Sequence, residues 1–450
     1  MVKKQAVRYV CTNCGAMQSS WAGRCAQCGE WNTLQEEAVI TATVAGKASY
    51  GRSLRTGSVS SSVAHDQTRL STGIPDVDAV LGGGIVPGSV NLIAGQPGIG
   101  KSTLLLQLSY AAAAKVPVLY VSGEESAHQV GLRAERLGTQ RQQLQLATST
   151  SADDVAATLT SGEFKLVIVD SIQTMSVEAV ASAPGSVSQI TNSTNLITSA
   201  AKQSDTAVLL VGHVTKEGMI AGPKVMEHMV DVVLQLEGDQ YGGFKILRAS
   251  KNRYGATTEA AIFEMHDKGL KIVENPSAAL LAERQITDGS VVLATLEGTR
   301  PLLVEVQALV NKTSYGYPKR AASGIELNRL NLLVAMLERR TKLNLSDQDI
   351  YINIVGGMRV NEPAADLAIC LAIGSAAKGL KLHDNAVVFG EVGLSGEVRH
   401  VPHVDKRIAE AKKLGYTMAI GPKARSGKVP TGLKGVTSVR DALNQFLKSD

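Results

Sequence analysis

A glycine-rich stretch in the first third of the chain has the residue types and spacing that bind phosphate. It runs Gly95, Gln96, Pro97, Gly98, Ile99, Gly100, Lys101, Ser102, Thr103, and matches the pattern G-x-x-x-x-G-K-S. The glycines let backbone N–H groups approach phosphate, the lysine reaches the β- and γ-phosphates, and the serine hydroxyl joins the Mg²⁺ shell. An apolar run at 90–94 precedes the stretch and a helical pattern follows it, which disfavours a chance glycine turn. The stretch therefore predicts an ATP and Mg²⁺ site in which Lys101 is catalytic.

Acidic residues end two of the apolar runs that must position this loop. Runs at 118–121, 166–170, 207–211 and 230–234 are separated by helix-compatible segments, which predicts an α/β fold with a mostly parallel sheet. Ligands bind at the carboxyl ends of such strands. We expect Asp170 to hold Mg²⁺, and Glu124, preferred over Glu125, to act as the general base. His213 is either a γ-phosphate sensor or a structural histidine.

Four cysteines near the N-terminus have the spacing of a metal site. Cys11, Cys14, Cys25 and Cys28 form C-x2-C-x10-C-x2-C, which predicts one Zn²⁺ held by four thiolates in residues 1–31. Four protein ligands leave no open position, so the predicted role is structural. A redox pair is the alternative. Trp21 and Trp31 flank the second cysteine pair; we expect them to pack on it, the alternative being an aromatic face for a partner.

Composition places the chain among multidomain α/β proteins. Its 450 residues are 44% hydrophobic with a formal net charge of +5, which permits nucleic-acid binding without requiring it. The sequence has no long apolar run and no apolar leader after Met1, so we expect a cytoplasmic protein with no membrane contact. Residues 32–66 are rich in Ser, Thr, Ala and Gly and are predicted to be a linker.

Two groups of cations are candidates for contact with DNA or with ATP. Lys216 and Lys224 lie in a glycine-containing stretch between 213 and 225, predicted to be a basic loop on a nucleic-acid backbone; an ordinary surface loop is the alternative. Lys251 and Arg253 follow a strand predicted at 244–248. Their i, i+2 spacing puts both on one side of an extended segment, suited to phosphate in a neighbouring subunit's site or to DNA. A solvated strand end is the alternative.

The order of these parts resembles the bacterial RadA (Sms) family over essentially the whole chain. The shared parts are the four-cysteine motif, a RecA-like P-loop ATPase core at 67–281, the motif at 251–255 and a C-terminal extension; Tyr254 stands where the family usually has Phe. The resemblance implies a DNA-dependent ATPase of homologous recombination and DNA repair. It implies binding of single-stranded and branched DNA, branch migration, a homo-hexamer, and a RecA recombinase as partner.

Residues 282–450 resemble the α/β proteolytic domain of Lon. Ala364 stands where the resemblance would place the nucleophilic serine, and Asp405, one residue before Lys406, stands where it would place the lysine. Without a hydroxyl nucleophile we expect a domain that is inactive as a peptidase. The alternatives to the recombination ATPase are an ATP-dependent Lon-type protease, which Ala364 disfavours, and a nucleotide-switched assembly protein like the circadian RecA relatives.

Overall fold

The computed structural model describes most of the chain, which forms two compact units. The described residues are 7–11, 16–18, 20–38, 69–213, 225–238, 244–314, 316–424 and 429–448. The first unit contains residues 1–237, 246–257 and 266–270, and the second contains 238–245, 258–265 and 271–450. Cys14, Lys216, Lys224 and most of the predicted linker lie outside the described residues.

The N-terminal segment folds as a small antiparallel ribbon. Strand β1 (Val7–Cys11) lies between β2 (Met17–Gln18) and β3 (Leu34–Ala38), and Cys11 is the register partner of Leu34. Leu34 is buried with Cys11 and Cys25 in a small core. Strand β3 lies within the segment that was predicted to be a linker. Its residues pair with β1 and complete the three-stranded sheet. The ribbon therefore extends to Ala38 and not to residue 31.

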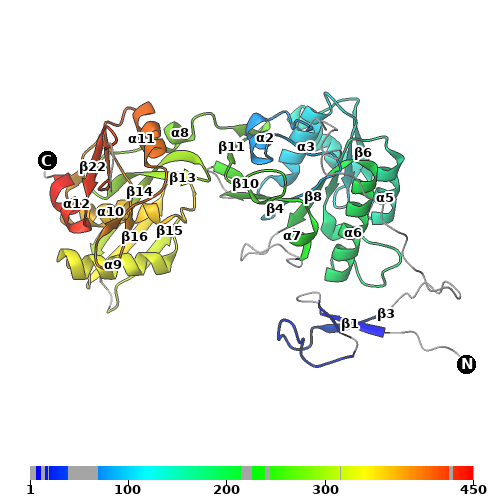
Figure 1. The fold of residues 1–450 in the computed structure, drawn as a ribbon, viewed down its shortest axis with the longest axis horizontal. Helices are drawn as coiled ribbons and strands as arrows, with labels where there is room; N and C mark the ends of the chain where they lie inside the picture. The colour runs from blue at the N-terminus through cyan, green and yellow to red at the C-terminus, as the bar shows by residue number, and fades with distance from the viewer. Residues whose placement is uncertain are drawn as a thin grey trace, which may run out of the picture. The chain divides into compact units, whose positions relative to one another are not determined.

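A mostly parallel sheet forms the centre of the first unit (Figure 1). Its order is β6-β5-β7-β8-β4-β9-β10, and β11 and β12 continue the same nine-stranded sheet. Strands β4, β5 and β7 are buried along their whole length, as their unbroken Val/Ile/Leu runs predict. The strands are β4 (Val90–Gly95), β5 (Val118–Ser122), β6 (Leu144–Thr148), β7 (Leu166–Asp170), β8 (Ala207–His213), β9 (Val232–Gly238), β10 (Phe244–Asn252), β11 (Ala260–His266) and β12 (Gly269–Ile272).

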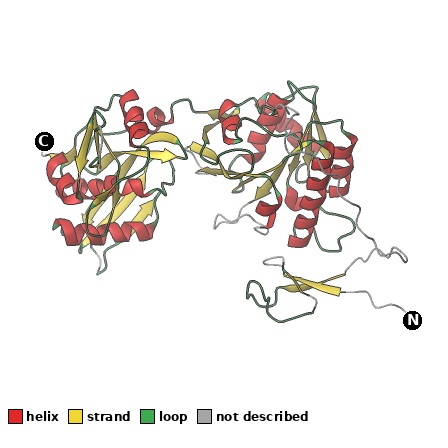
Figure 2. Ribbon diagram, viewed as in Figure 1, coloured by secondary structure: helices red, strands yellow, loops and turns green. Residues whose placement is uncertain are grey.

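Helices cover both faces of this sheet (Figure 2), as the sequence predicts. Helices α5 (Ala152–Ser161) and α6 (Val187–Ser204) bury apolar residues against Leu92 and Leu210 in one large cluster. Helix α3 (Lys101–Ala112) packs against β4, β5 and β7, and its leucines lie outside that cluster, on the opposite face. The other helical elements described in this unit are α2 (Pro75–Val80), α4 (Ala127–Leu137), η1 (Ile172–Thr174) and α7 (Val225–Met229).

The second unit is built on a seven-stranded sheet of order β15-β16-β14-β13-β18-β21-β22. Helix α10 (Asp366–Lys378) is buried over most of its length, and α11 (Val404–Lys413) packs on β13 and β14. The strands of this sheet are β13 (Ser290–Glu297), β14 (Arg300–Lys312), β15 (Arg320–Ser323), β16 (Gln348–Ile354), β18 (Ala386–Val388), β21 (Met418–Pro422) and β22 (Leu433–Val436).

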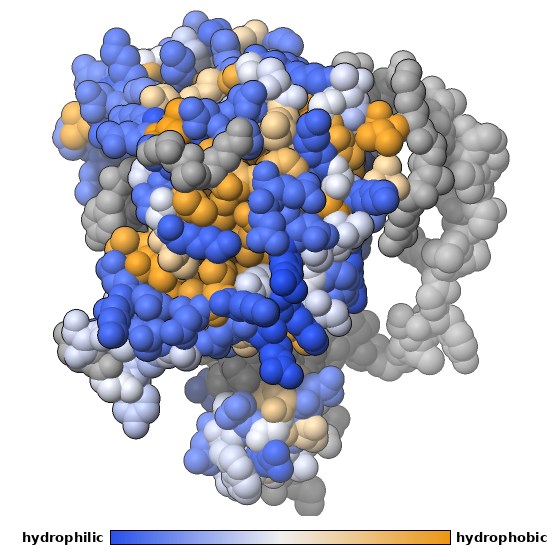
Figure 3. Space-filling model, turned by 90° about the vertical axis from the view of Figure 1, so that its left-hand side faces the viewer, coloured by the Kyte–Doolittle hydropathy of each residue, from blue (hydrophilic) through white to orange (hydrophobic). Residues whose placement is uncertain are grey.

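Shorter elements surround the second sheet. The side that carries α9 (Leu327–Thr341) and α12 (Val439–Phe446) exposes an area of apolar side chains bordered by hydrophilic ones (Figure 3). The remaining elements are η2 (Pro363–Ala365), β17 (Lys381–Leu382), β19 (Glu391–Val392), β20 (Val398–Arg399) and β23 (Leu447–Lys448). No helix among the described residues is long and apolar enough to span a membrane.

Helix α8 (Pro276–Leu281) corrects the predicted start of this unit at residue 282. Leu280 is buried, and the Ser277 hydroxyl donates to Glu410 over 2.7 Å while it accepts from the Leu303 amide over 3.1 Å. These contacts make α8 part of the second unit, which takes up the chain from residue 271.

Candidate functional site

The glycine-rich loop connects β4 to α3, so the helix N-terminus faces the position of a bound phosphate. Gly95 is required by space, because a Cβ there would lie 2.6 Å from the Leu236 carbonyl oxygen. Gly98 and Gly100 are required by conformation, with φ of 77° and 112°. The first-turn amides of α3, from Lys101 to Thr103, have no carbonyl one turn earlier to bind and are available to an anion.

Lys101 is almost completely buried at the base of this loop. Its Nζ donates to the carbonyl oxygens of Gly95 (2.8 Å) and Gln96 (3.0 Å). Burial lowers the pKa of the ammonium, while the charges of Asp170 and Glu124 act to raise it. The three residues predicted to handle the γ-phosphate are therefore close enough to interact, although they come from three different strand ends.

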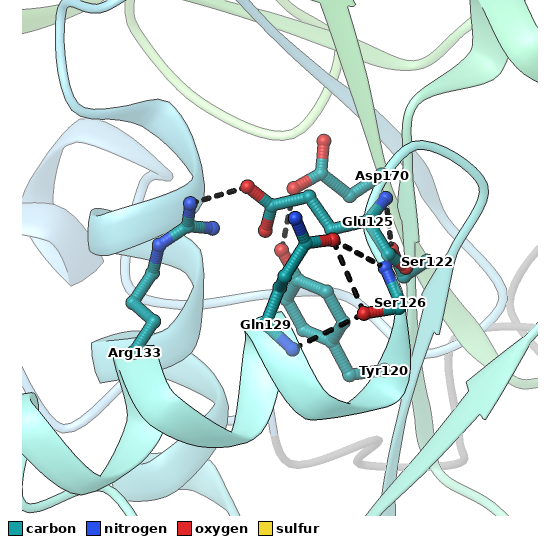
Figure 4. Close-up of polar contacts among 7 residues, drawn as sticks. All are labelled: Tyr120, Ser122, Glu125, Ser126, Gln129, Arg133 and Asp170. Atoms are coloured by element: carbon teal, nitrogen blue, oxygen red, sulfur yellow. Dashed lines mark hydrogen bonds and ion pairs between the residues drawn. The ribbon is translucent and has the colours of Figure 1, made fainter.

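Asp170 ends β7 beside the end of β5, and its carboxylate is held by a residue that sequence reasoning missed. The hydroxyl of Tyr120, which is buried in β5, donates to Asp170 Oδ2 over 2.5 Å (Figure 4). Burial first, and then the Asp170 charge and hydrogen bond, raise the pKa of Tyr120 well above its usual value, so the phenol remains a donor. The available signal was the phenol hydroxyl of Tyr120 within a run that is otherwise Val and Leu up to Ser122.

The two adjacent glutamates point to different partners. Glu124 accepts a very short hydrogen bond from Ser171, the residue that follows Asp170. Glu125 forms a 2.6 Å ion pair with Arg133 on α4 (Figure 4). Glu124 is therefore the carboxylate directed to the Asp170 strand end, and its role as the general base stays a prediction. The backbone of His213 pairs with Gly95 in the β4–β8 register, but its side chain lies outside the described atoms.

Lys251 and Arg253 lie at the opposite edge of the sheet from the phosphate-binding loop. Arg253 donates to Asp231 Oδ1 over 3.0 Å, and the other oxygen of this buried carboxylate accepts from the amide of Val90, where β4 begins. Strand β4 then rises about 3.3 Å per residue, or about 17 Å, before it reaches Gly95.

Both cations contact the same segment of chain, which agrees with the prediction that their side chains lie on one side. Lys251 Nζ donates to the carbonyl oxygens of Glu227 (2.6 Å) and Val230 (2.7 Å), at the end of α7. Burial, followed by the charge of Arg253, lowers the pKa of Lys251. Asp231 organises this cluster, and it was not singled out from the sequence because its role depends on a contact with β4.

Three of the four predicted metal-binding cysteines come together in the ribbon. The sulfur atoms of Cys11, Cys25 and Cys28 lie within 4.8 Å of one another, and those of Cys11 and Cys28 are 3.7 Å apart. A tetrahedral Zn²⁺ with Zn–S bonds of about 2.3 Å places its sulfurs about 3.8 Å apart. The donor set and spacing thus fit a thiolate-bound metal.

Trp21 and Trp31 lie outside the small core of the ribbon, with side chains 62% and 68% exposed. The Trp31 ring lies against Gly23 of the second cysteine knuckle, so one of the two tryptophans makes a contact of the expected kind. The exposed ring surfaces leave the alternative, an aromatic face for a partner, as a prediction.

In the second unit, a buried ion pair occupies the region of the predicted peptidase-like residues. Ala364 is buried in the core, while Asp405 and Lys406 are exposed at the start of α11. The next residue, Arg407, is fully buried and forms two hydrogen bonds, of 2.9 and 2.7 Å, with the Glu362 carboxylate. Position 364 therefore presents a methyl group to the core.

A parallel sheet with β4 at its centre and a glycine-rich loop leading into α3 define a P-loop ATPase with a RecA-like core. Residues 58–219 match the family model "AAA domain", residues 9–36 match "Rubredoxin metal binding domain", and residues 329–425 match "Subunit ChlI of Mg-chelatase". The chain is 47% identical to the DNA repair protein RadA of Pseudomonas aeruginosa, with 98% of each chain covered. It is 43% identical to the RadA proteins of Bacillus subtilis and Escherichia coli, with 99% of each chain covered. The chain belongs to the RadA family of DNA repair proteins.

Proposed function

We propose that this protein is an ATP-driven motor of homologous recombination that binds single-stranded DNA and drives branch migration of recombination intermediates. The proposal includes a homo-hexamer, a cytoplasmic location, branched DNA as substrate and a RecA recombinase as partner. Two kinds of finding support it: near-full-length relatives that are named DNA repair proteins, and a P-loop with its acidic partners assembled around it. The observation that carries it is that Glu124, hydrogen bonded to the residue after Asp170, lies at the carboxyl edge of the same sheet whose strand β4 leads into the loop that holds Lys101.

The residues of this site divide the work of ATP hydrolysis among them. Lys101 and the first-turn amides of α3 bind the β- and γ-phosphates, and the lysine exchanges its carbonyl partners for phosphate oxygens. Ser102 and Asp170 would hold Mg²⁺, which when bound would supply positive charge to the transferring phosphoryl group. Glu124, oriented by Ser171, accepts a proton from the attacking water.

Substitution of Lys101 tests the site and the DNA dependence together. The parent protein should hydrolyse ATP faster when single-stranded DNA is added, and Lys101→Ala should lose both basal and stimulated turnover. Lys115→Ala removes an exposed lysine just beyond α3 and serves as the matched control. Turnover of Lys101→Ala near the parent rate would refute the site. Parent turnover that does not respond to any DNA would refute the motor.

The identity of the base is tested by comparing two adjacent glutamates. Glu124→Gln should lower kcat by about 10²- to 10⁴-fold with little change in ATP binding, because it removes proton acceptance alone. Glu125→Gln should change kcat far less, since Glu125 is engaged by Arg133. The opposite order of effects would assign the base to Glu125.

Lys251 and Arg253 are proposed to act on a neighbouring subunit's ATP or on DNA, because their own loop lies at the other edge of the sheet. A positive charge that one subunit contributes to the γ-phosphoryl group bound by its neighbour accelerates hydrolysis by about 10³- to 10⁵-fold. Lys251→Ala and Lys101→Ala chains should each be inactive, yet mixed hexamers should regain DNA-stimulated hydrolysis at sites that have both residues. Lys202→Ala, whose exposed lysine lies 3.7 Å from Asp231, is the control. Mixtures that exchange subunits and stay inactive would exclude the trans role.

Lys216 and Lys224 are proposed to contact the DNA backbone. Replacement of both by Gln should weaken binding of single strands of every sequence, because phosphate contacts carry no sequence information. Each lost contact should reduce the slope of log K against log salt by about 0.7. An unchanged slope would remove these lysines from the DNA interface.

A further inference from the structure

We propose that Trp21 and Trp31 of the N-terminal ribbon form a stacking site for unpaired bases of single-stranded DNA. This inference rests on the proposed function, in that it assigns a place on the chain to part of the DNA contact. The cysteines of the ribbon fit a metal site, and the two tryptophans contribute nothing to its core.

The exposure of these side chains is the first observation. A tryptophan in a folded domain normally buries most of its large ring. Here Trp21 and Trp31 are 62% and 68% exposed, and they are the large apolar residues that the described part of the ribbon leaves open to solvent. Leu34 and the cysteines, in contrast, are buried.

The backbone of the second cysteine knuckle fixes the position of Trp31. Trp31 is the bridge partner of Arg24, and the Asn32 amide donates to the Gly23 carbonyl over 2.9 Å. The Trp31 ring lies against Gly23, where a Cβ would be 3.5 Å from its Cζ3 atom. Gly23 is two residues from Trp21 along the chain.

A fixed cation lies beside one ring. The Arg24 guanidinium is 6.0 Å from the Trp31 ring centroid, and its Nε donates to the Gly29 carbonyl over 2.6 Å. The ribbon to Ala38 contains four lysines and arginines and three glutamates, so its overall charge favours no partner. Arg24, held beside the Trp31 ring, is the cation that this site offers to a phosphate.

This combination fits nucleobases better than a protein partner. Every base has a flat π-face that stacks on an exposed aromatic ring, and a neighbouring cation binds the phosphate that follows. The fully buried core of a protein interface forms a patch that is more apolar than the rest of the surface. In the described ribbon the aliphatic side chain that would extend such a patch, Leu34, is turned inward.

The chain provides its own probe for this site, because Trp21 and Trp31 are its two tryptophans. Tryptophan fluorescence of the full-length, metal-loaded protein should be quenched by oligothymidylate and much less by a blunt duplex. The single variants Trp21→Phe and Trp31→Phe should each show quenching of the tryptophan that remains.

Affinity measurements complete the test. Trp21→Ala and Trp31→Ala should each weaken oligothymidylate binding by about 5- to 150-fold, a loss that persists as salt is raised because stacking is not a charge effect. The phenylalanine variants should retain most of the affinity. Tyr317→Ala, which removes an 87% exposed aromatic ring from the second unit, should bind like the parent. Unchanged metal content would show that the ribbon remains folded.

The outcomes separate this inference from the proposed function. Absence of quenching, with parent-like affinity in both alanine variants and preserved DNA stimulation of the ATPase, would overturn the stacking site alone. Parent-like affinity combined with loss of DNA-damage survival in cells would assign the tryptophans to a protein partner and also overturn it. A parent protein that binds no single-stranded DNA would overturn the proposed function itself.

Discussion

Removal of the Arg407 guanidinium is expected to destabilise the second unit strongly. This side chain is fully buried, and it connects Glu362 to β13 through a 2.6 Å hydrogen bond to the Ala294 carbonyl. Arg407→Met keeps most of the side-chain volume and removes the charge. It leaves the Glu362 carboxylate partly buried with only Thr295 and the Leu296 amide as donors.

The size of the effect follows from burial. Loss of one partner of a buried ion pair costs about 3–5 kcal/mol, because the other charge stays desolvated. The Glu362 side chain is 22% exposed and is therefore only partly desolvated. The expected loss of stability is accordingly at the lower end of this range, about 3 kcal/mol. At about 1.4 kcal/mol per factor of ten, this corresponds to roughly a hundredfold increase in opening. The double variant Arg407→Met/Glu362→Gln should recover part of the loss, since neither charge then remains.

Hydrogen exchange of the full-length protein, read by mass spectrometry on peptides from β13 and α11, measures this opening within one unit. The control is Arg399→Met, which removes a 57% exposed arginine paired with Glu397 at 2.6 Å and should leave protection unchanged. Equal protection in the parent and Arg407→Met would refute the reasoning. So would a double variant that is less stable than Arg407→Met.

The same pair predicts a pH dependence. Burial acts to raise the pKa of Glu362, but the hydrogen bonds and charge of Arg407 outweigh it, so the folded-state pKa is lowered. A lowered carboxyl pKa contributes stability above the unfolded value of about 4.3, and this contribution is lost as pH falls through the folded value. The difference in stability between parent and Arg407→Met should therefore be full at neutral pH and shrink below about pH 4.3. A difference that stays constant on acidification would contradict the assignment.

Three other predictions concern the remaining sites. Cys28→Ser should release the ribbon metal and unfold residues 7–38 while the ATPase core keeps its exchange protection; unchanged zinc content by metal analysis would count against it. Tyr120→Phe should raise the Mg²⁺ concentration needed for half-maximal ATPase activity, because Asp170 loses the donor that orients it; an unaltered Mg²⁺ dependence would exclude that role. The second unit should cleave no peptide, and a fluorophosphonate probe that labels a serine in residues 282–450 would overturn the inference drawn from Ala364.

The sequence predicted the phosphate-binding loop and the metal site because the residues of each lie close together along the chain. The phosphate-binding loop lies within nine positions, and its glycines have the conformations and close approaches that their spacing implied. The parallel sheet followed from unbroken Val/Ile/Leu runs, which only burial on both faces explains. The cysteine pairs likewise indicated a metal ribbon, although strand β3 extends it further than composition suggested.

Contacts between distant segments depended on the tertiary structure. Tyr120 reaches Asp170, and Asp231 reaches Val90, because β5 adjoins β7 and β9 adjoins β4, an order that no local pattern encodes. The sequence predicted that Lys251 and Arg253 share a side, but the direction of β10 placed them away from their own phosphate loop. The burial of Arg407 and the exposure of Trp21 and Trp31 were decided in the same way. Hydrophobicity says what a side chain prefers, while the space left by the completed core decides which side chains are enclosed.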